Sequence, residues 1–195
     1  MDDLTQGLLQ QLSGGALSQI SQQIGVDETA TGSVLSTAMP LLVSALANNT
    51  SDPAQAQSLH QALGNDHDGS ILNDLGSFLG DPQSANGAGI LGHVLGGQQS
   101  TITQTLADNT GLNSSQAGSL LEIAAPLVMG ALGQQQQQQG LDTDGLADFL
   151  GGQQQSIDAA NPMISGILTT FLDKDKDGSF LDDLFQMVLN FFRRK

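Results

Sequence analysis

The chain has 195 residues, a formal net charge of −15 and 13% charged residues, about half the share of an ordinary soluble domain. Residues 1–173 contain sixteen acidic residues and no Lys or Arg. This stretch therefore forms no Lys or Arg salt bridge within itself and has few groups with which to bind phosphates. Cysteine is absent, which excludes disulfides and thiolate metal sites and leaves the compartment undetermined.

The N-terminal part is predicted to be helical. Apolar residues recur there at the three-to-four residue spacing of an amphipathic helix, at Leu4, Leu8, Leu9 and Leu12 and again at Leu17, Ile20 and Ile24. The first residues lack the positive region of a secretory signal. The longest apolar windows, residues 38–47 and 123–132, span ten residues each, whereas a membrane helix needs about 20. We therefore expect neither window to cross a bilayer and take a cytoplasmic location as the default.

An internal repeat dominates the sequence. Residues 18–46 align without a gap on residues 104–132, at an offset of 86. Nine positions are identical, including Gly25 with Gly111 and Pro40 with Pro126. A fixed pattern of Gly, Ser, Leu and Pro over this length indicates a duplication.

Each copy is predicted to be helical. Asp27 and Asn113 follow the shared glycines, and their short side chains suit the N-cap of a helix. Pro40 and Pro126 fall inside apolar runs, so each long helix is expected to kink or restart there. No run of β-branched residues alternates with polar ones, so no strand is predicted.

The linking segments suggest how the copies are joined. Gly and Asn are frequent around residues 80–89, and six glutamines at 134–139 are interpreted as a low-complexity loop. We predict an all-α protein, a tandem multi-helical repeat with a C-terminal helical hairpin. The predicted units are repeat unit 1 at residues 1–85, repeat unit 2 at 86–155, and the hairpin with its Asp-rich loop at 156–195.

Three phrases connect the chain with a known family. They are "NGAGILGHVLGG" at 86–97, "MPLLVSAL" at 39–46 and the pattern "DxDGSxLxDL" at 66–75 and 175–184. Together they resemble the bacterial YidB-like family, the domain of unknown function DUF937, over most of the chain. The resemblance implies an all-helical fold with homeodomain-like helix arrangements, and it implies little about activity.

The stretch "FLDKDKDGSFLDDLF" at 171–185 has the spacing of a calcium loop. Alternating carboxylates can converge on a hard cation, and Gly178 stands where such a loop turns sharply. Leu184 occupies the twelfth position, where an EF-hand has a bidentate Glu, so a shortened loop would have to close earlier. The candidate Ca²⁺ ligands are Asp173, Asp175, Asp177, Ser179 and Asp182.

A structural interpretation of the same residues stays open. Ser179 can cap the helix that follows, and Asp182 three residues on completes a capping box. Ser70 with Asn73 repeats this device without the full set of aspartates. The aspartate pairs at 66 and 68 and at 142 and 144 are weaker calcium candidates than residues 173–182.

The remaining residues give little sign of catalysis. His60, His67 and His93 show no zinc-protease spacing, and His93 is interpreted as a structural histidine that satisfies a nearby backbone group. Without Cys, and without Lys or Arg before residue 174, a nucleophile has few groups to activate it. We predict that the protein is not an enzyme and has no small-molecule substrate.

The C-terminal segment 179–195 contains four of the seven Phe and ends in three cations. It is interpreted as a core helix. The alternative interpretation is an anchor that binds a partner or a membrane surface, and this segment is the one candidate for membrane contact in the sequence. The predicted function is a non-enzymatic interaction or self-association module that binds a protein partner or a second copy, with Ca²⁺ as the candidate cofactor. The alternative is a divergent helix-turn-helix nucleic-acid binder, which the acidic Asp27 and Glu28 disfavour.

Overall fold

The computed structural model describes residues 4–160. All regular secondary structure in this part of the chain is helical and there is no strand, as the sequence predicts. The α-helices are α1 (Leu4–Leu12), α2 (Ala16–Ile24), α3 (Glu28–Asn49), α4 (Pro53–Asn65), α5 (Ser70–Asn73), α6 (Leu75–Gly80), α7 (Gly87–Leu95), α8 (Gln99–Thr110), α9 (Ser114–Gln139) and α10 (Thr143–Ala160), with 3₁₀ turns at Pro82–Ala85 and Gly96–Gln98.

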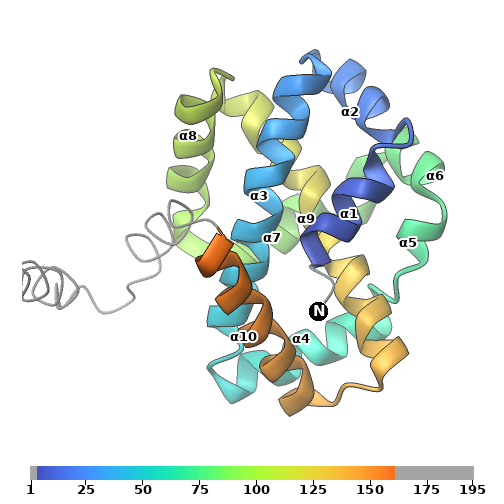
Figure 1. Cartoon of the computed structure of the whole chain (residues 1–195), viewed down its shortest axis with the longest axis vertical. Coiled ribbons are helices and arrows are strands. Elements are labelled where there is room, and N and C mark those ends of the chain that lie inside the picture. The colour runs from blue at the N-terminus through green and yellow to red at the C-terminus, as the bar shows by residue number, and fades with distance from the viewer. Residues whose placement is uncertain (1–3, 161–195) are drawn as a thin grey trace, which may run out of the picture.

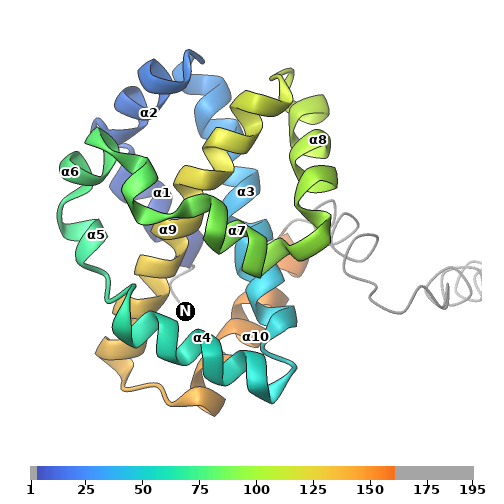
Figure 2. The ribbon, with the colours of Figure 1, turned by 180° about the vertical axis from the view of Figure 1, so that it is seen from behind.

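Helices α3 and α9 pack against each other at the centre of the fold, and the other helices surround them (Figure 1, Figure 2). Every residue is buried at 38–47 in α3 and at 123–133 in α9. A helix that is covered on all sides is apolar all round, which explains the uninterrupted apolar windows in the sequence. One hydrophobic core runs through both predicted repeat units, and their division into units stays a prediction.

The predicted caps of the two central helices are confirmed. The Asp27 carboxylate accepts a hydrogen bond at 2.9 Å from the backbone N–H three residues further on. Asn113 accepts the corresponding bond from Gln116 at 2.9 Å, and the Gln116 side chain accepts from the Asn113 N–H at 3.2 Å. Both helices follow a glycine in the left-handed region, Gly25 with φ 71° and Gly111 with φ 73°. The two starts are therefore built alike.

The prolines do not interrupt the central helices, so of the two predicted outcomes the restart is wrong, whereas the kink stays a prediction. Pro40 lies within α3 and Pro126 within α9, and both are buried. Each proline removes one backbone hydrogen bond. The apolar residues on both sides of it are buried against neighbouring helices, and this burial offsets the loss.

The ten-residue apolar windows belong to helices of 22 and 26 residues. By length and composition alone, α3 and α9 could each cross a membrane. Most of each helix is buried inside the fold, however, and core helices of soluble proteins pass the same test. The cytoplasmic location stays a prediction.

The glutamine run at 134–139 is helical, and the predicted loop is wrong. Glutamine is a good helix former, and two of the amides here find partners on neighbouring elements. Gln136 is buried and donates to the carbonyl of His60 at 3.3 Å, while Gln137 donates to the carbonyl of Asp68 at 3.3 Å. The run therefore fastens the end of α9 to α4 and to the loop that follows α4.

The helix that follows each central helix packs on the other central helix. Helix α4, which follows α3, contacts α9, whereas α10, which follows α9, contacts α3. Helices α4 and α10 also contact each other at one end of the molecule (Figure 1). The two halves of the described chain thus interlock, and this places α4 beside α7 and the end of α3.

Candidate functional site

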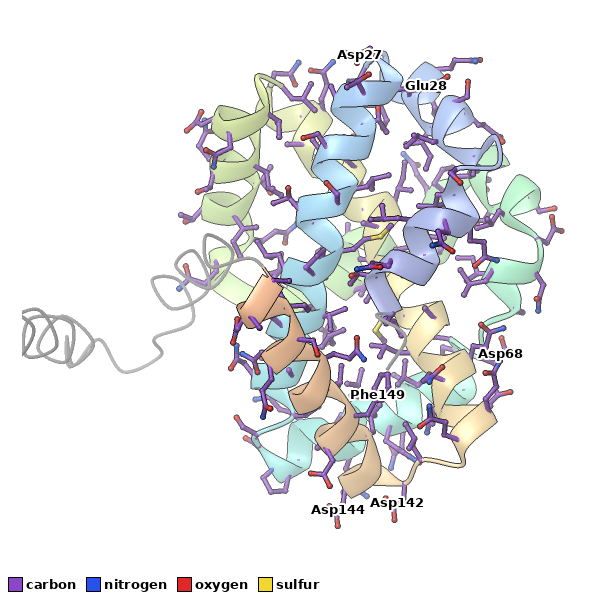
Figure 3. All side chains as sticks on the ribbon, viewed as in Figure 1. Asp27, Glu28, Asp68, Asp142, Asp144 and Phe149 are labelled. Carbon is purple, nitrogen blue, oxygen red and sulfur yellow. The ribbon has the colours of Figure 1, made fainter. Side chains whose placement is uncertain are left out.

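The predicted calcium ligands Asp173, Asp175, Asp177, Ser179 and Asp182 lie outside the described residues, as does most of the predicted hairpin. Within residues 4–160, no group of three or more His, Asp or Glu could hold a metal ion. The weaker aspartate pairs lie at different parts of the surface, with Asp68 on one side and Asp142 and Asp144 at one end (Figure 3).

The weaker aspartates take part in local turns. Asp142 accepts a hydrogen bond from the Gly145 N–H at 2.8 Å at the start of α10. Asp68 accepts from the Ser70 N–H at 2.9 Å, and hydrogen bonds from Ser70 lower the pKa of the Asp68 carboxyl. The predicted capping box of Ser70 with Asn73 is wrong, because Ser70 is already inside α5 and Gly69, with φ 91°, precedes it. The Asp68 carboxylate, rather than the Ser70 hydroxyl, accepts from a backbone N–H at the start of this helix, that of Ser70.

A half-open groove of about 500 Å³ lies between α4 and α7. We call it the α4–α7 groove. Its walls also include the end of α3 and one residue of α9. The apolar lining residues are Leu46, Leu59, Ala62, Ile90, Val94 and Met129. Leu46, Val94 and Met129 are buried and form its floor, whereas the other three are half-buried and form its sides.

Polar groups stand around this apolar surface. Asn49 donates to the carbonyl of Val94 at 3.0 Å and so joins the end of α3 to α7. The Ser58 hydroxyl donates to the carbonyl of Ala54 in its own helix at 2.9 Å. The other polar lining residues are Gln55, His67, Asn86 and His93. The groove is thus apolar inside and polar at its rim.

The α4–α7 groove continues into an acidic end. A second hollow of about 360 Å³ is lined by Asp66 and Asp68, and it shares His67, Asn86 and Ile90 with the groove. Both aspartates are exposed. Two carboxylates therefore stand at one end of an apolar surface, in a part of the chain that has no Lys or Arg to pair with them.

His93 fulfils its predicted structural role. Its Nδ1 lies 2.9 Å from the carbonyl oxygen of Gly89, one turn earlier in α7. Because a carbonyl oxygen only accepts, Nδ1 carries the proton in this hydrogen bond. His60 makes a similar bond, from Nε2 to the carbonyl of Leu141 at 3.1 Å, which ties α4 to the start of the α10 segment.

The His67 ring lines both the groove and its acidic end. The ring is half-buried where the groove meets its acidic end. Burial lowers the pKa of His67, and the neighbouring Asp66 carboxylate raises it by a smaller amount. The net lowering of the His67 pKa favours the uncharged ring beside the apolar surface.

This arrangement suits binding better than bond breaking. The one hydroxyl on α4 at the groove, that of Ser58, is turned to its own helix. The ring of His93 is likewise bonded to the backbone of its own helix rather than to a nucleophile. An apolar floor with a polar rim and a charged end is typical of a site that binds an apolar side chain or segment.

Sequence reasoning missed the groove. Its lining residues come from four separate stretches, 46–49, 55–67, 86–94 and residue 129. Their proximity depends on the packing of α4 on α9, which no local pattern reveals. The family phrases were the sequence signals near it, since Ile90, His93 and Val94 belong to "GILGHVLGG", Leu46 ends "MPLLVSAL", and the pattern at 66–75 supplies the acidic end.

The chain belongs to the family described as bacterial proteins of unknown function (DUF937), whose model matches residues 6–135. This confirms the YidB-like resemblance. The matched residues include α3, α9 as far as residue 135, and the whole α4–α7 groove with its acidic end. Neither the curated proteins nor the solved structures contain a match to the chain.

Proposed function

We propose that the protein is a non-enzymatic interaction module, and that the α4–α7 groove with its acidic end is the contact surface. The observation that carries this proposal is the continuity of the apolar floor with the exposed carboxylates of Asp66 and Asp68. The chemistry that fits is an apolar protein segment that ends in cations. Such a segment would bury its apolar side chains on Leu46, Val94 and Met129 and place its charges on the acids.

The finer account of the fold is that it contains two copies of one helical unit. Residues identical at an offset of 86, matched left-handed glycines and matched N-caps support this duplication. The homeodomain-like arrangement implied by the family rests on the order of helix, glycine turn and helix in each copy. In each copy the helix that follows the central helix packs on the central helix of the other copy, as in exchanged dimers.

The duplication offers a reason why the groove lies where it does. If α7 corresponds to α1 and α4 to α10, the counterpart of the groove lies between α1 and α10. There the Leu4 N–H donates to the side chain of the buried Gln153 at 3.2 Å and joins the two helices. We infer that α1 and α10 are joined directly, whereas α4 and α7 are separated by the groove, which leaves its apolar surface for a partner.

The nucleic-acid alternative finds less support. In a helix-turn-helix protein the second helix enters the major groove and must be exposed. Here the corresponding helices, α3 and α9, are buried through most of their length, and the exposed start of α3 bears Asp27 and Glu28. We expect no retardation of mixed-sequence DNA in a gel shift at low salt. Salt-sensitive retardation would favour this alternative instead.

The contact surface can be tested with a peptide probe. We would titrate a synthetic peptide of residues 179–195, which is apolar and ends in cations, into the full chain carrying Phe185→Ser and Phe192→Ser. The two substitutions weaken competition between the chain's own C-terminal segment and the added peptide. Methyl NMR signals of Leu59 and Ile90 should shift and saturate. The same chain with Leu59→Gln and Ile90→Gln, followed through the methyl signals of Leu46 and Val94 in the same groove, should bind at least about tenfold more weakly, since two apolar contacts on half-buried residues are lost.

A matched control places the same polar change away from the groove. Leu17 and Ile24 are half-buried apolar residues on α2, at the opposite end of the molecule from α4 (Figure 1). The chain with Leu17→Gln and Ile24→Gln should bind the peptide like its parent. Absence of binding, or equal losses in both pairs of substitutions, would contradict the proposed surface.

A further inference from the structure

We propose that the α4–α7 groove is the docking site of the chain's own C-terminal segment, residues 185–195. This inference rests on the proposed function and names the occupant of the same surface. The apolar residues of the segment would lie on the groove floor, and its terminal cations would lie at the acidic end formed by Asp66 and Asp68.

Charge distribution is the first argument. Residues 4–160 carry thirteen acidic residues and no Lys or Arg, so Asp66 and Asp68 have no Lys or Arg partner within this part of the chain. All five cations of the protein lie at residues 174–195, and three of them, Arg193, Arg194 and Lys195, are consecutive. The C-terminus is therefore the strongest internal source of positive charge for the acidic end.

The order of side chains in the segment matches the order of surfaces in the groove. Phe185, Val188, Leu189 and Phe192 have the spacing i, i+3, i+4 and i+7, which would put four of the six apolar side chains of residues 185–192 on one face of a helix, with Met187 and Phe191 off that face. The three cations follow directly. An apolar stripe next to a basic end complements an apolar groove next to an acidic end. Figure 2 shows α4 and α7 on the face that would receive this segment.

The length of the connection favours the same chain over a second copy. Residues 161–184 provide 24 residues between α10 and the segment, enough to span about 80 Å when extended. A body of this size has a radius of gyration of about 15 Å, so the segment can reach any point of its surface. A tether of this kind gives an effective concentration of about a millimolar, well above that of a second chain in dilute solution.

The absence of cysteine makes a cross-linking test free of background. The full chain would carry Ser58→Cys at the exposed rim of the groove and Asn190→Cys, which lies off the apolar stripe. A short bismaleimide reagent, used at micromolar protein, should join these positions within one chain. The control chain pairs Asn190→Cys with Gln22→Cys, an exposed position on α2 far from α4 (Figure 1). We expect at least a tenfold lower yield in the control.

Each outcome decides the proposal. Intrachain joining of positions 58 and 190, reduced severalfold by Arg193→Gln with Arg194→Gln, supports it. Equal yields in the two pairs, or no joining, overturns it. Covalent dimers in place of the intrachain product would also overturn it and identify a second copy as the occupant. If joining fails while the peptide of residues 179–195 still shifts Leu59 and Ile90, the proposed function stands and this inference falls.

Discussion

Gly133 of α9 lies directly against the backbone carbonyl of His67, so closely that a Cβ atom at position 133 would collide with that oxygen. The carbonyl oxygen of Leu63 is also near, 3.3 Å from where that Cβ would stand. Helix α9 thus contacts the end of α4 and the loop after it backbone to backbone. This contact sets the position of His67 and the adjacent acids, and with it the acidic end of the groove.

We predict that Gly133→Ala destabilises the fold by at least about 1–3 kcal/mol, because the added methyl group overpacks against main-chain atoms that have little freedom to move. Gly92→Ala is the matched control, since position 92 of α7 is exposed and a Cβ there would meet no atom within 4 Å. That change should stabilise by about 0.5–1 kcal/mol. Urea denaturation followed by circular dichroism measures both. Equal effects of the two substitutions would contradict the close contact.

A second prediction concerns Ser44 in the middle of α3. Its side chain is fully buried, and its hydroxyl has no hydrogen-bond partner among the described residues. Ser44→Ala removes an unsatisfied polar atom and should stabilise the protein by about 1 kcal/mol. Ser21→Ala is the control, because the buried Ser21 hydroxyl donates to the carbonyl of Leu17 at 3.0 Å. Thermal unfolding should show a gain for the first change and none for the second.

Local signals in the sequence predicted the local features of the fold. The N-caps at Asp27 and Asn113 were predictable because a cap depends on a residue and its next three neighbours. The restart at Pro40 and the loop at 134–139 were wrong for the opposite reason. Both were inferred from local composition, whereas packing of buried neighbours and amide bonds to α4 decide the outcome.

The candidate site was less predictable than the fold. The groove depends on which helix packs on which, and α4 packs on α9 rather than on α3, the helix that it follows. The sequence did indicate the structural role of His93, because a histidine one turn after Gly89 can reach its carbonyl. Nothing in it placed His67 and His93 in the same groove, since 25 residues separate them.

The third prediction uses the lowered pKa of His67. The unfolded histidine titrates near pH 6.5, and the folded one titrates lower because burial disfavours the charged ring. Between these two values the unfolded chain binds more protons, so the His67 contribution to stability falls as pH decreases from about 7. His67→Gln should remove this part of the pH dependence.

Asp68 and Asp74, whose pKa values are lowered by hydrogen bonds from Ser70 and Ser77, lose their contributions only below about pH 4.

The measurement is urea denaturation of the two chains at several values between about pH 5 and pH 8. The difference in unfolding free energy between the parent and His67→Gln should change with pH in this range and level off above about pH 7.5. A constant difference across the range would show that His67 has an ordinary pKa in the folded protein. Comparing the two chains cancels the effect of the large acidic charge, which is common to both.

The last prediction concerns the Asp-rich loop that the sequence indicates at 173–182. If Asp173, Asp175 and Asp177 hold calcium with Asp182, titration calorimetry of the chelator-treated full chain should give one site with a Kd of about 10⁻⁴–10⁻³ M, because the closing Glu of an EF-hand is missing. Asp175→Asn with Asp177→Asn should abolish the heat of binding. Asp66→Asn, which removes an exposed acid elsewhere, should leave it unchanged.

Light scattering of the same samples then tests self-association, which calcium should change in the parent chain and not in the double variant. No heat at millimolar calcium would leave the loop as a helix joint, with Ser179 and Asp182 acting as a cap.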